Sequence, residues 1–386
     1  MSKKILIFST AYIPFIGGAE IAIKEITDRV GKQFEFHLIT AQFKKDLAKV
    51  EQVGNVTVHR VGRGHPLFDK LLLPFTGAVC AWRLMRKHEY ICMWGMMVTF
   101  GSGAAYMTNI VRRIRSKKKI PIVLTLQEGD SENHLRFRWG GLIALSWKLA
   151  LKQTEYLTAI SNFLLHRAEN IGFSGKSALI PNGVDTRIFT KKFSEVEKKN
   201  MRGKLQKKEG DIFLVTTSRL THKNAVDDII SSLVYLPAHI HLIIIGRGEE
   251  GNKLQQLART LKVTDRVKFL GFIDYSEIPK YFSICDIFVR PSRSEGFGNS
   301  FIEAMAAGLP VIATPVGGIV DFIDDRETGL FASTDNPKSI ALLVAQLLDD
   351  PVLVQHITTL AKLRVVEKYS WDCIALQMKE KVFNIF

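Results

Sequence analysis

Ile284 to Gly318 read ICDIFVRPSRSEGFGNSFIEAMAAGLPVIATPVGG, and this stretch decides the fold. The apolar run that ends at Val289 predicts a buried parallel strand, and residues 309–313 predict a second one. The strong helix formers between them predict a helix that ends at a glycine cap, Gly308. The stretch is therefore interpreted as a strand-helix-strand unit of a parallel α/β sheet.

The polar loop at 290–298 leads directly into the start of that helix. Backbone N–H groups and the positive end of the helix dipole point into such a loop, so it predicts an anion-binding site. Gly296 and Gly298 carry no Cβ, so a bulky anion can approach their backbone closely. Asn299 and Ser300 are expected to cap the helix.

Two acids flank this loop. Glu295 lies in the loop, and Glu303 sits about one turn into the helix with its side chain leaning back toward the start. Carboxylates beside an anion site are expected to bind hydroxyl groups, because a carboxylate accepts two hydrogen bonds from a ribose diol. For an isolated pair at this spacing, solvated surface acids would be the simpler interpretation, but the surrounding loop and helix favour hydroxyl binding.

The sequences EGFG at 295–298 and EAMAAGLPVI at 303–312 resemble the donor-binding motif of retaining glycosyltransferases of family 4, also called group 1. The resemblance implies the GT-B fold, in which two doubly wound parallel-sheet, Rossmann-like α/β domains face each other across a cleft. It implies that Gly296, Phe297, Gly298 and Asn299 bind the donor. It also implies that Glu303 holds the ribose, while Glu295 contacts the donor sugar or supports an oxocarbenium ion.

Further donor contacts are expected where other strands of the second domain end. Arg219 and Lys223 follow the strand at 212–217, and their spacing resembles the cationic pair with which the family neutralises the leaving diphosphate. Gly246 ends the strand at 240–245, where a glycine lets the donor come close. The resemblance implies that backbone groups near Ile273 touch the nucleobase.

The first domain contributes a second set of candidates. Gly17 and Gly18 follow the first strand, 5–8, and resemble the family's N-terminal glycine loop, which approaches the donor diphosphate and the acceptor. Many family members carry a histidine followed by an acid where this chain has Gln127 and Glu128. This departure puts the sugar-contacting role of that position in doubt, because glutamine forms hydrogen bonds but does not titrate. His134 and Ser161 are additional candidate sugar or acceptor contacts.

The domain boundaries follow from turns and from the resemblance. Asn182-Gly183 is a strong turn signal and resembles the family's interdomain crossing. We expect an acceptor-side domain at 1–183 and a donor-binding domain at 184–365. A C-terminal helix at 366–386 is expected to return to the first domain.

The chain has a formal net charge of +15, with the densest basic run at 112–119. Upstream, residues 68–87 mix leucines and aromatic residues with cations, a composition that suits an anionic membrane surface as well as an ordinary solvated face. Residues 91–111 have no charge and are long enough to cross a bilayer. Their glycine, serine and threonine positions favour a strand and a packed helix instead. No nucleic-acid-binding module is visible.

The four cysteines are scattered, which is typical of a reducing cytoplasm. The apolar run after Met1 is too short for a signal peptide. We therefore expect a cytoplasmic protein, in one alternative peripheral on the inner face of the plasma membrane. Three pairs of adjacent acids lack the pattern of a metal site, so no metal or other cofactor is expected. They are Asp227-Asp228, Asp324-Asp325 and Asp349-Asp350.

The predicted function is retaining, metal-independent transfer of a sugar from a UDP- or GDP-sugar to a hydroxyl of a glycan or lipid-linked acceptor. The reaction is expected to serve polysaccharide, lipopolysaccharide or glycolipid synthesis. Three alternatives remain open. They are a sugar-nucleotide epimerase of the same fold, a phosphorylase with a lysine-bound pyridoxal cofactor, and a non-catalytic nucleotide-sugar binding subunit.

Overall fold

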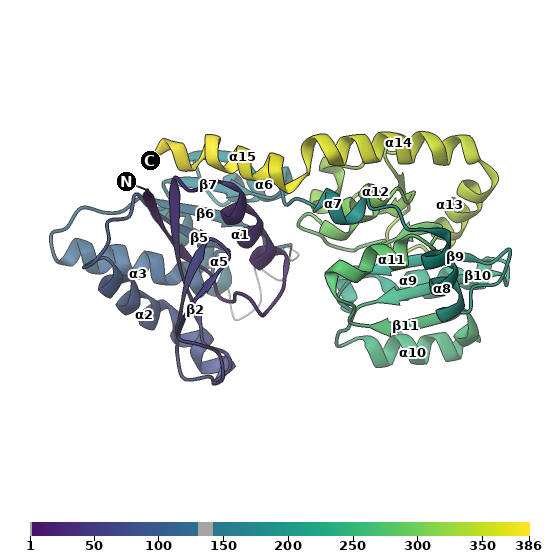
Figure 1. Ribbon diagram of the computed structural model, residues 1–386, viewed down its shortest axis with the longest axis horizontal. Helices are drawn as coiled ribbons and strands as arrows, with labels where there is room; N and C mark the ends of the chain where they lie inside the picture. The colour runs from purple at the N-terminus through teal and green to yellow at the C-terminus, as the bar shows by residue number, and fades with distance from the viewer. Residues whose placement is uncertain (1, 130–141) are drawn as a thin grey trace. The chain divides into compact units, whose positions relative to one another are not determined.

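The computed structural model describes residues 2–129 and 142–386. The chain forms two compact units, drawn in Figure 1. The first consists of Met1–Asn182 with Trp371–Phe386, and the second of Gly183–Ser370. The sequence placed the boundaries at 183/184 and 365/366. Helix α14 (Pro351–Lys368) runs on past residue 365, so the chain leaves the second unit only after Ser370.

The first unit is built on a sheet with the strand order β3-β4-β2-β1-β5-β6-β7-β8. Neighbouring strands are parallel except β3 and β4, which pair antiparallel. The strands are β1 Lys3–Phe8, β2 Phe34–Ala41, β3 Val50–Val53, β4 Val56–Val61, β5 Cys92–Met96, β6 Ile122–Leu126, β7 Tyr156–Ala159 and β8 Lys176–Leu179. The described helices are α1 Gly18–Arg29, α2 Pro66–Leu84, α3 Gly101–Ile114, α5 Leu142–Gln153, α6 Asn162–Asn170 and α15 Trp371–Lys381, with a 3-10 turn, η7, at Phe383–Ile385.

Both faces of this sheet are buried, as a parallel sheet requires. Successive side chains of β1 point to opposite faces. Ile5 and Ile7 join a core that includes α1 and α15, whereas Leu6 and Phe8 join a core that includes α3. The C-terminal helix thus completes the first unit's core.

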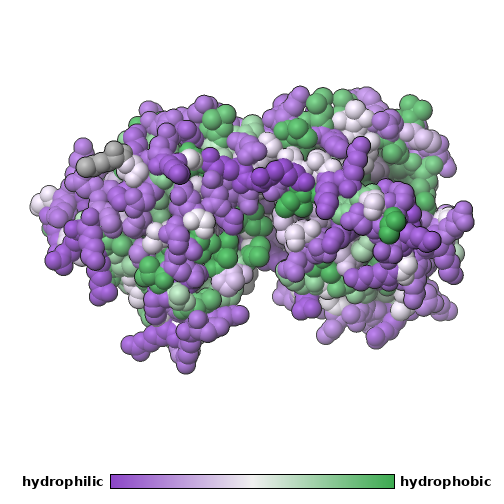
Figure 2. All heavy atoms as spheres, in the orientation of Figure 1, coloured by the Kyte–Doolittle hydropathy of each residue, from purple (hydrophilic) through white to green (hydrophobic). Residues whose placement is uncertain are grey.

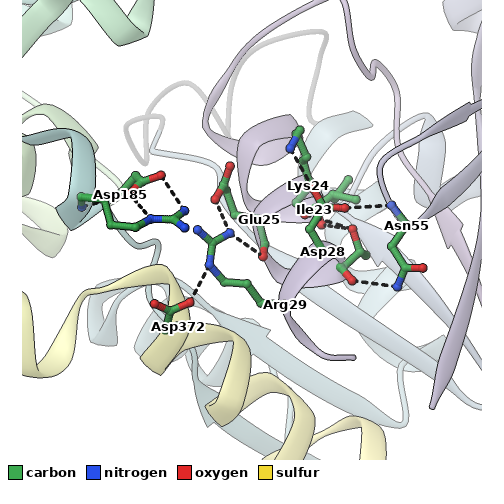
Figure 3. A network of polar contacts seen from close by, with 10 residues as sticks. Ile23, Lys24, Glu25, Asp28, Arg29, Asn55, Asp185 and Asp372 are labelled. Atoms are coloured by element: carbon green, nitrogen blue, oxygen red, sulfur yellow. Dashed lines mark hydrogen bonds and ion pairs between the residues drawn. The ribbon is translucent and has the colours of Figure 1, made fainter. Parts of the chain in front are cut away.

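A polar network supplements this packing (Figure 3). Arg29 Nε of α1 donates to Asp372 Oδ1 of α15 over 2.8 Å, and the Arg29 guanidinium also pairs with Glu25. Asp28 accepts from Lys24 and from the backbone N–H of Asn55. The network ties the C-terminal helix and the turn before β4 to the same helix, α1.

The second unit holds a parallel sheet in the order β11-β10-β9-β12-β13-β14. Its strands are β9 Ile212–Thr217, β10 Ile240–Ile245, β11 Val267–Gly271, β12 Ile287–Val289, β13 Val311–Ala313 and β14 Leu330–Phe331. Its α-helices are α7 Thr186–Phe189, α8 Glu195–Lys204, α9 Val226–Ser232, α10 Gly251–Thr260, α11 Ile278–Phe282, α12 Asn299–Ala307, α13 Pro337–Asp349 and α14. Its 3-10 turns are η2 His222–Asn224, η3 Leu233–Tyr235, η4 Thr264–Arg266, η5 Tyr275–Glu277 and η6 Gly317–Asp321.

The uncharged stretch at 91–111 folds into buried β5 and most of α3, as the strand-and-helix interpretation expected. Among residues 2–129 and 142–386, no single helix has the length and apolar composition needed to cross a membrane. One sharply bent pair, α13 with α14, passes that test on length and composition alone.

Candidate functional site

The predicted donor residues of the second unit lie after the carboxyl ends of its parallel strands. Since neighbouring parallel strands end at the same edge of a sheet, β9, β10, β11 and β12 bring their following loops together there. Arg219 and Lys223 follow β9, Gly246 follows β10, Ile273 follows β11, and the 290–298 loop follows β12. The topology therefore gathers these sequence-predicted positions at one edge.

Hydrogen bonds join the β9 and β12 loops directly. Within the β9 loop itself, the Asn224 side-chain amide donates to the Arg219 carbonyl over 2.6 Å. The backbone N–H of Arg293 donates to the Lys223 carbonyl over 2.8 Å. The Arg219 side chain is exposed and that of Lys223 is half-buried. Two cations are thus carried by a loop that is fixed to the candidate anion loop.

Helix α12 begins immediately after Gly298, which has φ +94° and makes no side-chain cap. The prediction that Asn299 and Ser300 cap this helix is wrong, because both lie within the helix and the Ser300 hydroxyl instead accepts from Arg290 over 2.7 Å. Gly308 ends the helix with φ +82°, as predicted. No side chain caps the helix at Gly298, and anion binding at the start of α12 stays a prediction.

A Cβ at Gly298 would lie 2.6 Å from the Phe301 ring and 3.2 Å from Glu295 Cγ. Together with its positive φ, this explains the requirement for glycine there. The neighbouring Phe297 is 1% exposed and packs on the Phe322 ring at 5.0 Å. Its side chain therefore anchors the loop in the core, and the donor contact predicted at Phe297 stays a prediction.

Arg290 is the residue that sequence reasoning missed. Its guanidinium donates to Asn224 Oδ1 over 2.9 Å and to Ser300 Oγ, and it pairs with the Glu295 carboxylate. It also lies over the Phe301 ring, 5.3 Å from the centroid. Arg290 itself is buried. One cation therefore joins the β9 loop, the acid of the candidate anion loop and the first turn of α12.

Glu295 is held from two sides. Besides Arg290, its carboxylate accepts from the backbone N–H of Gly296 over 3.0 Å, and its carbonyl accepts from the N–H of Gly318 over 3.2 Å. Gly317 has φ +57°, and a Cβ there would lie 1.8 Å from the Glu295 carbonyl oxygen. Glycine at position 317 therefore allows this close approach.

Glu303, on α12, is buried, and burial raises the pKa of its carboxyl to about 7, while the charge of Arg290 acts in the opposite direction. A carboxyl with a pKa near neutrality accepts hydrogen bonds more strongly when it ionises. Such perturbed groups concentrate at functional sites, although structural burial also produces them.

Gly246 has φ +138°, and a Cβ there would lie 1.9 Å from the Ser218 carbonyl oxygen. Its N–H donates to the Gly271 carbonyl over 2.7 Å. The glycine therefore lets the ends of β9, β10 and β11 meet closely. The donor contact predicted at Gly246, like that at half-buried Ile273, stays a prediction.

Arg293 braces the same loop against α9. Its guanidinium pairs with Asp227 at 2.8 Å, Asp228 at 3.2 Å and Asp335 at 2.5 Å. Burial raises the pKa of Asp228 to about 6, with Arg293 opposing the shift. These acids are thus engaged by a cation, and no cluster among the described residues has three His, Cys, Asp or Glu placed to hold a metal ion.

Candidate site residues of the first unit form hydrogen bonds within the protein. Gly17 is the N-cap of α1 and Gly18 its first residue, as the glycine-loop interpretation expected. The Gln127 side-chain amide exchanges hydrogen bonds with that of Asn182, at 3.2 and 3.4 Å. Glu128 is 9% exposed, and its carboxylate accepts from the backbone N–H groups of Val98 and Gln127.

Ser161 is fully buried and caps α6 through a hydrogen bond from the N–H of Leu164. His134 lies outside the described residues. Sugar or acceptor contacts by these residues and by Gln127 and Glu128 stay predictions. The internal hydrogen bonds give Gln127 and Glu128 a structural role that the sequence did not reveal.

Comparison with known proteins agrees with this arrangement. Residues 197–364 match the family described as Glycosyl transferases group 1, and residues 16–188 match Glycosyltransferase Family 4. The chain is 30% identical over 399 residues to the GDP-mannose-dependent monoacylated alpha-(1-6)-phosphatidylinositol monomannoside mannosyltransferase of Corynebacterium glutamicum, with 100% of this chain and 98% of the relative covered. An uncharacterized glycosyltransferase of Methanocaldococcus jannaschii is 28% identical, with 96% of each chain covered.

Two solved structures share the fold. Sucrose-phosphate synthase from Thermosynechococcus elongatus has a TM-score of 0.83 at 19% identity and covers 100% of this chain and 99% of its own. Anabaena Alr3699/HepE, solved in complex with UDP-glucose, has a TM-score of 0.78 at 21% identity, with 99% of each chain covered. These likenesses confirm the predicted GT-B fold class with two doubly wound parallel-sheet domains.

Proposed function

This chain belongs to the group 1 glycosyltransferases, and from that premise we propose that it transfers a sugar from a nucleotide-diphosphate donor to a hydroxyl with retention at the anomeric carbon. The main observation behind the proposal is that Arg290 and Arg293 of the 290–298 loop form hydrogen bonds with the Arg219–Asn224 loop. Through this joining, two cations and the start of α12 are available to a single diphosphate.

Each group then has a role that follows from its chemistry. As the bond between the anomeric carbon and the diphosphate oxygen breaks, negative charge grows on the leaving group. Arg219, Lys223 and the N–H groups at the start of α12 stabilise that charge. Glu303 accepts hydrogen bonds from the ribose, and Glu295 faces the donor sugar.

No general base is required. The acceptor oxygen bonds to the anomeric carbon on the face that the diphosphate leaves, and its proton passes to the departing phosphate oxygen. This front-face course preserves the anomeric configuration.

The substrate classes are proposed from the relatives. The Corynebacterium glutamicum relative and a Mycobacterium tuberculosis relative, 28% identical over 393 residues, are both named as GDP-mannose-dependent phosphatidylinositol monomannoside mannosyltransferases. GDP-mannose is therefore the first donor to test and a glycolipid the first acceptor, with UDP-sugars as the alternative donors.

The test is calorimetric titration of the full chain with GDP-mannose and UDP-glucose, followed by a turnover assay with a glycolipid acceptor. The double variant R219Q/K223Q is expected to lose binding roughly 100-fold, because two charge-assisted contacts to phosphate are removed. K192Q/K199Q, which neutralises two exposed cations elsewhere in the same unit, is the matched control and should bind normally.

Unchanged affinity and turnover in R219Q/K223Q would refute the proposal. Conversion of the donor without any acceptor would instead identify an epimerase. Binding without turnover across an acceptor panel would identify a non-catalytic binding subunit.

A further inference from the structure

Helix α2 of the first unit exposes an apolar stripe. Leu67, Leu71, Phe75 and Val79 follow one another at four-residue spacing, so they share one helix face. These side chains are 43–66% exposed, as are two neighbours on the same face, Phe68 and Leu72. An exposed row of leucine and phenylalanine on one helix is unusual for a surface that faces only water.

The stripe is exposed because α2 buries its other side. Leu73, Gly77 and Ala81 are buried at the same four-residue spacing. A Cβ at Gly77 would lie 2.8 Å from the Ala104 methyl group of α3, so small residues let the two helices pack closely. The outward stripe is thus a feature of a well-packed helix.

The segment that carries the stripe is rich in cations and poor in acids. Residues 63–127 contain eleven Lys or Arg and only two acids, so they carry nine of the chain's fifteen net positive charges. One of the acids, Asp69, is buried and accepts from the backbone N–H groups of Arg63, Gly64 and His65. The exposed cations are Arg63, Arg83, Arg86, Lys87, Arg113, Arg115, Lys117, Lys118 and Lys119.

Helix α3 extends the same surface. Ile110 is 42% exposed and Ile114 is 77% exposed. The guanidinium carbon of Arg115 lies 4.6 Å from the centre of the Trp82 ring of α2, and Lys117 Nζ lies 5.2 Å from it. The basic end of α3 is therefore attached to α2. Figure 2 shows hydrophobic residues gathered among hydrophilic ones over the part of the first unit where Figure 1 places α2.

From the apolar stripe of α2 and the cations around it, we infer that the α2–α3 face docks onto an anionic lipid bilayer. The Leu and Phe side chains enter the boundary between headgroups and acyl chains, while Lys and Arg pair with anionic headgroups. Charge complementarity selects this partner over a second copy of the chain, because two such basic faces repel each other. The inference goes beyond the sugar transfer and does not depend on it.

The test is sedimentation of the full chain with phosphatidylcholine vesicles, with and without about a third phosphatidylglycerol. Binding is expected only with phosphatidylglycerol and should fall as salt is raised, because exposed charges are screened. F68S/F75S and, separately, R113Q/K117Q should each reduce partitioning roughly tenfold or more. L342S/V352S and K192Q/K199Q are matched controls, since they change exposed apolar and cationic residues of the second unit.

Equal binding to both vesicle types, or no effect of the two variants on the face, would overturn the inference. Light scattering that detects a dimer lost in F68S/F75S would assign the face to a second copy and would equally overturn it. Calorimetry measures whether the same variants still bind a nucleotide sugar. This measurement separates a failure of the membrane-docking inference from a failure of the proposed function.

A second inference rests on an independent observation, the position of Arg290. We propose that Arg290 is a positioning residue that holds Glu295, the Lys223–Asn224 turn and the start of α12 in register for the donor. Its three hydrogen-bonding partners come from three segments, and its burial leaves the guanidinium no alternative partner in water. This inference rests on the proposed function.

Variant R290L is expected to lower kcat at least tenfold, because Glu295 loses its orienting partner, with a smaller change in the affinity for the nucleotide alone. R290K, which keeps the charge but not the planar fork, should restore only part of kcat. Removing the cation should also move the pH midpoint of nucleotide-sugar binding upward, because the charge of Arg290 opposes protonation of Glu303. A role in packing alone would not move that midpoint.

Should R290L fail to fold, the double variant R290L/E295Q removes both members of the buried pair and avoids an unpaired buried charge. Full activity in either folded variant, or an unmoved midpoint, would overturn the positioning role. Normal donor binding by R219Q/K223Q would refute the proposed function itself. Normal activity of the Arg290 variants alone would refute only the positioning role, so the two failures are distinguishable.

Discussion

At the scale of single residues, Glu303 couples burial to protonation. Its pKa is raised from 4.5 to about 7 by burial. The folded chain therefore holds this proton more tightly than the unfolded chain. The resulting stabilisation is fully present below pH 4.5 and is lost as the pH rises through 7. The shift corresponds to about 3 kcal/mol.

We expect E303Q, which is neutral at every pH, to gain stability relative to the parent chain as the pH is raised from 5 to 8. Thermal melts at both pH values measure this difference. E209Q, at an exposed acid, is the control and should show no such trend. If the difference in melting temperature between E303Q and the parent chain is the same at pH 5 and pH 8, the assigned effect of burial on the Glu303 pKa is contradicted.

Some residues of the candidate site could be predicted from the sequence, and one could not. Glu295, Gly298 and Glu303 could be singled out because their spacing follows the strand-loop-helix pattern. Arg290 could not, because a cation at the end of an apolar strand looks like any loop residue. Its partners Asn224, Glu295 and Ser300 are brought to it only by the fold. Spatial convergence of distant segments leaves no local pattern in the sequence.

At the scale of elements, the pattern of apolar runs predicted strands such as β9, β10 and β12 well, since these are short, contain β-branched residues and are largely buried. Helix starts were predicted less well. Asn299 and Ser300 are good capping residues, yet the chain turns into α12 at Gly298 because of its positive φ. Backbone conformation decided between adjacent capping candidates there, and composition could not reveal it.

The C-terminal helix α15 and the 3-10 turn after it offer a test of which contacts hold an element in place. Phe383 is fully buried, with its ring 5.4–5.9 Å from those of Phe34, Phe36 and Trp94. By contrast, the side chain of Asp372, which pairs with Arg29, is 79% exposed.

We therefore expect F383A to lower the free energy of unfolding by about 3–5 kcal/mol, the usual effect of emptying a buried aromatic site. D372N should lower it by less than about 1 kcal/mol, because an exposed ion pair contributes little. Denaturant titration of both variants measures the difference. A larger loss in D372N than in F383A would mean that the ion pair, and not the apolar core, secures the helix.

At the scale of the whole molecule, the distribution of charge separates two tasks. The excess of cations in residues 63–127 belongs to the first unit, whereas Arg219 and Lys223 are placed at the sheet edge of the second. A substitution in one set should therefore leave the other set's ligand unaffected. Effects of distant, independent sites usually add.

Under the proposed function, the second unit's own groups neutralise the diphosphate: two cations and the backbone N–H groups at the start of α12. The acids that follow the two cations along the chain, Asp227 and Asp228, are paired with Arg293. We therefore expect sugar transfer to continue at an unchanged rate after exhaustive treatment with EDTA. A metal-dependent glycosyltransferase treated in parallel shows that chelation was complete. Loss of turnover that magnesium restores would contradict this prediction. It would show that a divalent cation, and not Arg219 with Lys223, stabilises the leaving diphosphate, because removing the ion would then remove the stabilising charge.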